Sequence, residues 1–236
     1  MSGDWFEDIV AARDRGLVDR FGRPWKDGIF NVDFEQMAAL MVDADPRWLF
    51  CGTYAFEPTD SRASWVLVTA GLSSPFGLES EAELPADPSG ASSGHGFELC
   101  IELPAFDPWA VTLLNGLLVY QLGVGYGLLQ GIVLDNNHRL PLKPMGLLPA
   151  GPTAIAAVMT RPPIDFECNA VLRSGFYDLI ELVGVTRNEL AWSTKHGVQQ
   201  LLALHEQHHR LVTKLDRQEL PLSEPVELPA ELAELF

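Results

Sequence analysis

The chain has 236 residues, which is long enough for one domain whose hydrophobic core needs neither a disulfide nor a bound metal. With 47% hydrophobic and 20% charged residues, the composition is typical of a globular protein and argues against extensive disorder. The formal net charge of −16 argues against binding to nucleic acids or anionic membrane surfaces, and it is compatible with a basic protein partner.

Residues 1–45 are expected to form a helical lead-in to the main domain. Within it, residues 33–42 place Phe34, Met37 and Met41 at helical spacing, which predicts a helix packed on the body. The first residues have neither a basic start nor an apolar run, so no signal peptide is expected. The three cysteines are far apart in sequence, which fits a protein of the reducing cytoplasm. They are Cys51, Cys100 and Cys168.

Three segments in the first half of the chain are predicted to be β-strands. They are Leu49–Phe56, Trp65–Thr69 and Gly96–Leu103. Trp65–Thr69 is continuously apolar and β-branched, as in a strand covered on both faces. Gly96–Leu103 alternates, so one face should meet the core, while the face with Glu98, Cys100 and Glu102 should be at least partly wet. Residues 79–95 hold little to bury and are predicted to form an exposed loop.

Trp109–Leu134 contains no charged residue and is long enough for a membrane-spanning helix. Its five glycines argue against a span, since each one costs a helix about 1 kcal/mol relative to alanine. We instead predict a buried helix over residues 108–122, a glycine turn, and a buried strand over residues 128–134. The same glycines do not match a dinucleotide-binding loop, because the third glycine falls one residue early and the helix precedes them.

The next predicted elements are a strand over Phe176–Val185 and a helix that begins at Thr186. Thr186 and Glu189 match a capping box, in which each side chain satisfies the free amide of the other residue. The helix is expected to break near Gly197 and to resume over residues 198–215.

Residues 216–236 hold six acids, one arginine and three prolines, and they are predicted to form a mobile or loosely docked acidic tail. The predicted strands and helices do not alternate strictly along the chain. The expected fold class is therefore α+β, with a central, mixed and mostly antiparallel sheet flanked by helices.

His205, Glu206 and His209 fit the zinc-binding pattern His-Glu-x-x-His. On a helix the two histidines would share one face and could bind zinc, and Glu206 would act as general base for a metal-bound water. The polar neighbours and the lack of a clear third ligand argue against this function. We therefore expect a solvated helix face at these residues and keep a zinc-dependent hydrolase as the alternative hypothesis.

Four segments carry a resemblance to a known family. They are Trp65–Ser73 (WVLVTAGLS), Ser93–Glu102 (SGHGFELCIE), Pro108–Asn115 (PWAVTLLN) and Leu179–Leu190 (LIELVGVTRNEL). In motif, order and spacing they resemble the Suppressor of fused family. The resemblance implies a domain over residues 46–215, between the lead-in of residues 1–45 and the tail of residues 216–236.

The resemblance also implies a non-enzymatic module that works by binding protein and has no catalytic residue, cofactor or metal. The animal relative sequesters a transcription factor with this domain and a second one, which is not expected here. No binding residue is therefore carried over, and the binding surface stays open. Similar single domains of bacteria include immunity proteins, so a cytoplasmic immunity-type protein that neutralises a basic toxin partner is expected.

Overall fold

The computed structural model describes residues 5–32, 45–164, 167 and 169–222. Its strands are β1 (Pro24–Asn31), β2 (Gly52–Phe56), β3 (Trp65–Ala70), β4 (Ser92–Leu103), β5 (Arg139–Pro141), β6 (Ile155–Arg161), β7 (Asn169–Leu172) and β8 (Gly175–Thr186). Its α-helices are α1 (Trp5–Phe21), α3 (Pro108–Gly125), α4 (Arg187–His196) and α5 (Val198–Gln207).

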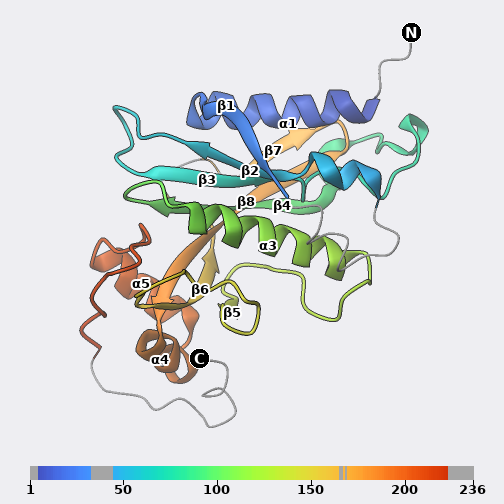
Figure 1. Cartoon of the computed structure of the whole chain (residues 1–236). Helices are drawn as coiled ribbons and strands as arrows, with labels where there is room; N and C mark the ends of the chain where they lie inside the picture. The colour runs from blue at the N-terminus through green and yellow to red at the C-terminus, as the bar shows by residue number, and fades with distance from the viewer. Residues whose placement is uncertain (1–4, 33–44, 165–166, 168, 223–236) are drawn as a thin grey trace.

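The eight strands of this described part form one sheet in the order β1-β2-β3-β4-β8-β6-β5, and β7 pairs with β8 beside that path. β4 and β8 run parallel, whereas the other paired strands are antiparallel. The predicted α+β class with a mixed, mostly antiparallel sheet is confirmed (Figure 1).

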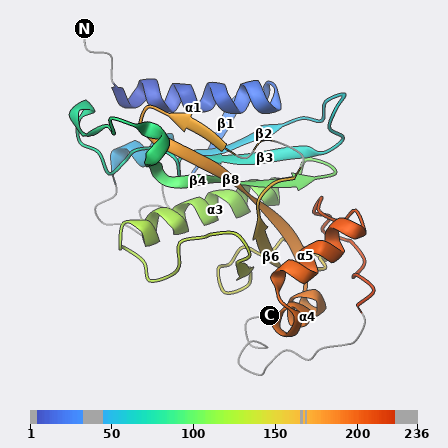
Figure 2. The same cartoon turned by 180° about the vertical axis from the view of Figure 1, so that it is seen from behind.

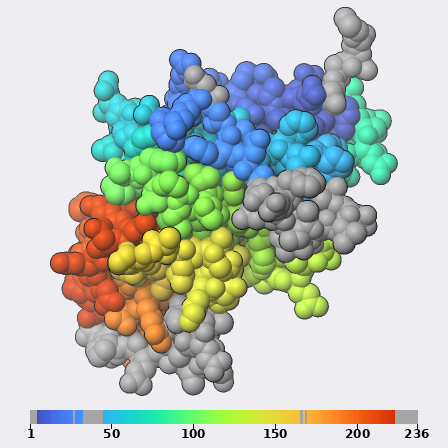
Figure 3. Space-filling model, in the orientation of Figure 1, coloured from blue at the N-terminus to red at the C-terminus, as the bar shows by residue number. Residues whose placement is uncertain are grey.

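Helices cover both faces of the sheet. Neighbouring residues of a strand point to opposite faces, and here both faces carry apolar side chains that must be buried. α1 lies over one face and α3 over the other (Figure 1). Ile9 and Leu17 of α1 share a core with Val66 and Val68 of β3. The buried leucines of α3 pack in a second core with the opposite face, including Leu67. The space-filling view shows α3 between the N-terminal elements and the C-terminal part (Figure 3).

β4 is buried on both faces, which corrects the prediction of a partly wet face. Glu98 and Cys100 are completely buried, and Glu102 is 5% exposed. The physical reason is that α1, from the start of the chain, covers the face on which the alternation places these residues. β3 is covered on both faces, as predicted.

The capping box at the start of α4 is present as predicted: the Thr186 hydroxyl accepts from the Glu189 amide, and the Glu189 carboxylate accepts from the Thr186 amide. The break at Gly197 is also present, but α5 ends at Gln207 rather than near residue 215. Beyond it the chain turns back to the sheet, where the Thr213 amide donates to the Glu102 carbonyl at 2.8 Å. Figure 2 shows α5 pointing toward the end of the sheet where β4 finishes.

The predicted strand over residues 128–134 is wrong. α3 continues to Gly125, and the following segment folds back on it as a loop in which the amides of Leu128 and Leu129 both donate to the Gly123 carbonyl. The buried Gln121 side chain accepts from the Leu134 amide and donates to the Ile132 carbonyl. The side-chain amide of Gln121 therefore holds residues 132–134, which the sequence pattern had predicted to be a strand of the sheet.

The lead-in contains α1, as predicted, and also the edge strand β1, which was not predicted. β1 pairs with β2 through an irregular register between Pro24 and Ile29. The first residues of the predicted tail are docked, since Arg217 and Leu220 are buried. The predicted helix over residues 33–42 and the tail beyond residue 222 lie outside the described residues. In the part described, we find no helix long and apolar enough to cross a membrane.

Replacing Gly94 with alanine is expected to destabilise the fold strongly. Gly94 has a φ of 57°, and an added Cβ would lie 2.3 Å from the Leu72 carbonyl oxygen. Gly94→Ala should lower the free energy of unfolding by about 3 kcal/mol, of which the backbone strain accounts for about 1 and the overlap for the rest. Gly127→Ala is the matched control, because φ is 70° there but the space is open, and it should cost only about 1 kcal/mol. Urea titration of both variants measures the difference; equal losses would contradict the close packing at Gly94.

Candidate functional site

The His-Glu-x-x-His motif does not form a helix face with two histidines. α5 ends at Gln207, and His209 lies beyond it with a φ of 52°. His205 is completely buried, whereas Glu206 and His209 are exposed. The prediction that His205 lies on a solvated face is therefore wrong. Among the residues that the structure describes, no group of three or more His, Cys, Asp or Glu side chains could hold a metal ion.

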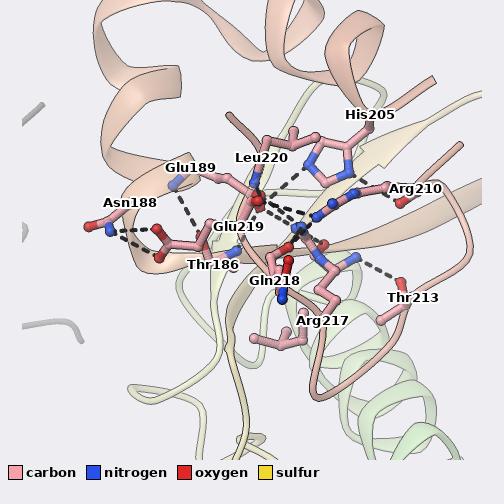
Figure 4. Close-up of polar contacts among 12 residues, drawn as sticks. Thr186, Asn188, Glu189, His205, Arg210, Thr213, Arg217, Gln218, Glu219 and Leu220 are labelled. Carbon is pink, nitrogen blue, oxygen red and sulfur yellow. Dashed lines mark hydrogen bonds and ion pairs between the residues drawn. The ribbon is translucent and has the colours of Figure 1, made fainter. Parts of the chain in front are cut away.

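His205 instead faces a buried carboxylate at the start of α4 (Figure 4). The Glu189 carboxylate accepts from both terminal nitrogens of Arg217, one of them at 2.7 Å. It also accepts the backbone amides of Leu220 at 2.9 Å and Thr186 at 3.0 Å. His205 Nε2 lies 3.5 Å from Glu189 Oε2. We call these five residues the Glu189 cluster.

The Glu189 cluster ties separate elements together. Arg217 also donates to the Gly184 carbonyl of β8 at 3.0 Å. His205 Nδ1 lies 3.2 Å from the Arg210 carbonyl, which can only accept, so Nδ1 carries a proton. The cluster thus fastens α5 and residues 210–220 to α4 and β8, and its role is structural. His205 lies on a helix, as predicted, but its buried partner Glu189 belongs to another helix, α4.

The charge of Glu189 is stabilised by this environment. Burial by itself raises the pKa of the Glu189 carboxyl, but His205 and Arg217 outweigh it and hold the pKa well below its ordinary value. Because both charges of the Arg217–Glu189 pair are removed from water, the pair stabilises the fold only while it is complete.

The family segment Gly71–Ser73 surrounds a second buried carboxylate. Glu98 of β4 accepts the amides of Gly71 at 2.8 Å and Ser73 at 2.9 Å, and the hydroxyls of Thr69 and Ser73 at 2.6 Å. Ser73 is completely buried, and its hydroxyl is used by this carboxylate. The turn therefore serves packing around the Glu98 carboxylate.

Cys51 and Cys100 are buried and free. Burial raises the pKa of both thiols well above the ordinary range of cysteine. Both thiols are therefore buried and protonated rather than reactive thiolates. Cys168 lies outside the described residues.

The loop of residues 126–133, which follows α3, exposes large apolar side chains. The exposed fractions are 46% for Leu128, 56% for Ile132 and 45% for Val133. Apolar residues that gather on one exposed segment mark interaction surfaces more often than scattered ones do. The space-filling view shows this part of the chain projecting beside α3 (Figure 3).

A pocket of about 590 Å³ lies beside the 126–133 loop. Tyr126 and Val133 of the loop line it, together with His95 and Glu83. The Tyr126 ring rests against Trp48, with 5.2 Å between ring centroids. Burial raises the pKa of Tyr126 to about 12 and lowers that of His95, so both groups are neutral near pH 7. The pocket therefore has aromatic and apolar wall beside the polar side chains of Glu83 and His95.

Residues 49–218 match the family model described as Suppressor of fused protein (SUFU), and this match covers more than half of the chain. The chain belongs to the Suppressor of fused family. The family identification from the four segments is thus confirmed. A search among curated proteins found no match to its sequence.

The fold is similar to solved structures of this family. A chain of the Sufu-Fu complex matches with a TM-score of 0.57 at 17% identity, and the match covers 91% of both chains. A Suppressor of fused homologue from Neisseria gonorrhoeae matches with a TM-score of 0.58 at 12% identity, covering 94% of this chain and all of the other. Drosophila Suppressor of Fused matches with a TM-score of 0.53 at 18% identity, over 72% of this chain but only 42% of that one.

The stability contributed by Glu189 should depend on pH. A carboxylate whose pKa is depressed on folding contributes stability above its unfolded pKa of about 4.3 and loses it as the pH falls toward the folded pKa. Glu189→Gln should lower the free energy of unfolding by about 3 kcal/mol at pH 7, because Arg217 is left unpaired. Urea titrations should show that the difference from the wild type shrinks below about pH 4. A difference that does not change with pH would contradict the assignment.

His205→Ala should destabilise the fold because it removes a buried ring from the Glu189 cluster. The expected loss is about 2 kcal/mol in free energy of unfolding. The neighbouring Glu206→Ala removes an exposed side chain from the same helix and should change it by less than about 0.5 kcal/mol. Thermal and urea unfolding would distinguish the two; equal effects would show that His205 does not stabilise the cluster.

Proposed function

We propose that this domain acts by binding another protein through the 126–133 loop. The observation that carries the proposal is the exposure of Leu128, Ile132 and Val133 on one short segment beside an open pocket. An apolar surface of this kind gains free energy when a partner removes it from water. The proposal is supported by the relative whose structure is that of the Sufu-Fu complex.

The partner is a basic protein, and this domain neutralises it in the manner of an immunity protein. The support is electrostatic. The chain carries a net charge of −16, and acidic side chains flank the apolar surface: Glu83 lines the pocket and Asp135 follows the loop. Complementary charge speeds association and discriminates between partners, while a buried apolar anchor slows dissociation.

Two apolar-to-polar substitutions test the surface. Leu128→Ser and Ile132→Ser should each weaken partner capture about tenfold or more, since each removes an apolar anchor from the interface. Val171→Ser is the matched control, because Val171 is 59% exposed but lies on β7, away from the loop. The measurement is a pull-down from lysate of the source cell followed by titration with the purified partner. Equal retention by the loop variants and the control would contradict the proposed surface.

Salt dependence tests the charge of the partner separately. If acids steer a basic protein, the association rate constant should fall about tenfold or more between low and physiological ionic strength, while the dissociation rate changes little. Stopped-flow mixing or surface binding at several salt concentrations measures both rates. An association rate that is indifferent to salt would contradict a basic partner, even where binding through the loop persists.

A further inference from the structure

A second concave surface lies on the α1 side of the sheet, remote from the 126–133 loop. It is a cleft of about 660 Å³ between the end of α1, the connection from β2 to β3, and the segment after α5. Arg20, Arg62, Lys214 and His209 line it, together with the Ser61 hydroxyl. It forms because α5 ends early and Thr213 fastens the returning chain to the end of β4.

The cleft gathers positive charge in a strongly acidic protein. Arg20, Arg62 and Lys214 are three of only 16 lysines and arginines in the chain. Within the described part of the structure, no carboxylate forms an ion pair with any of these three cations. The carboxylate of Glu102, which lines the same cleft, acts electrostatically on Arg62 without forming such a pair.

Backbone carbonyls hold the two arginines in place. Arg62 donates to the carbonyls of Ser64 at 3.1 Å and Glu57 at 2.6 Å, and Arg20 donates to that of Asn169 at 2.8 Å. The Nη1 atom of Arg20 is buried and, in the described residues, has no hydrogen-bond partner. Because Nη1 is buried, it does not face a ligand in the cleft, and Arg20 contributes its charge rather than this donor. Burial also lowers the pKa of Arg62, which shows that its charge is partly desolvated.

Glu102 is the acidic group that lines the same cleft. It is 5% exposed, and its carboxylate accepts a hydrogen bond from the Ser64 hydroxyl. Its single charge opposes an anion, but three cations outweigh it. Removing that charge should therefore strengthen anion binding, whereas removing one of the cations should weaken it.

We propose that this cleft binds a small phosphate-bearing ligand. One guanidinium satisfies a carboxylate, whereas several cations and a hydroxyl around one concavity match the two charges and three oxygens of a phosphate group. The volume lies within the range of small-molecule sites, and Phe21 and Pro104 supply wall for an organic part. The site is independent of the proposed protein interaction, because it uses a different face of the fold.

Calorimetric titration of the full chain with inorganic phosphate tests the proposal, with acetate at equal ionic strength as the comparison anion. Phosphate should bind saturably and more tightly than acetate. Lys214→Gln and Arg62→Gln should each weaken phosphate binding about tenfold, as expected for the loss of a charge-assisted hydrogen bond. Lys214 is exposed, so its variant remains informative if Arg62→Gln perturbs folding. Glu102→Gln should strengthen binding several-fold.

Arg173→Gln is the matched control, since Arg173 pairs with Glu81 at the surface and does not line the cleft. It removes one positive charge and should leave phosphate affinity unchanged. A phosphate monoester, titrated in parallel, distinguishes the sources: tighter binding than inorganic phosphate indicates an organic ligand, and equal binding indicates free phosphate. Absence of saturable binding, or equal weakening by Arg173→Gln and Lys214→Gln, would overturn the proposal.

Discussion

The buried carboxylate of Glu98 is the interaction on which the centre of this fold depends. A negative charge in the middle of β4 is unfavourable in an apolar core unless hydrogen bonds compensate it. The turn after β3 supplies them from its own backbone, through the amides of Gly71 and Ser73. Arg13 of α1 adds a buried positive charge nearby and donates to the Ser74 hydroxyl at 2.7 Å. The Glu98 side chain thus connects the turn to the central strand, and Arg13 links α1 to them. Glu98 and the turn both belong to the segments that carry the family resemblance.

The Glu189 cluster repeats this arrangement at the other end of the molecule. There too a buried carboxylate collects backbone amides and one arginine, and the residues that donate come from segments far apart in the chain. The two carboxylates fasten the N-terminal and C-terminal parts to the same sheet. Both surfaces proposed for binding, the apolar 126–133 loop and the basic cleft, lie outside these two buried centres.

Local patterns predicted the parts of this fold that local interactions form. The capping box needs only Thr186 and Glu189, three residues apart, and it was found from sequence. The burial of Glu98 was missed because alternation does not reveal that α1 returns over the second face of β4. His205 was misplaced for the same reason, since its partners belong to other elements. The basic cleft was not predicted at all, because Arg20, Arg62 and Lys214 come from three separate segments and meet only in the folded chain.

The parallel pairing of β4 with β8 has a consequence for how the chain folds during synthesis. β4 ends at Leu103, whereas β8 ends at Thr186, so the strand that completes the centre of the sheet is made long after its neighbour. Until then one edge of β4 is open, and β7 has no strand to pair with. Contacts so distant in sequence slow folding and leave apolar edges exposed on the nascent chain. A nascent chain that has emerged from the ribosome only as far as residue 174 should therefore be a good client for chaperones, while one that has emerged as far as residue 222 should not.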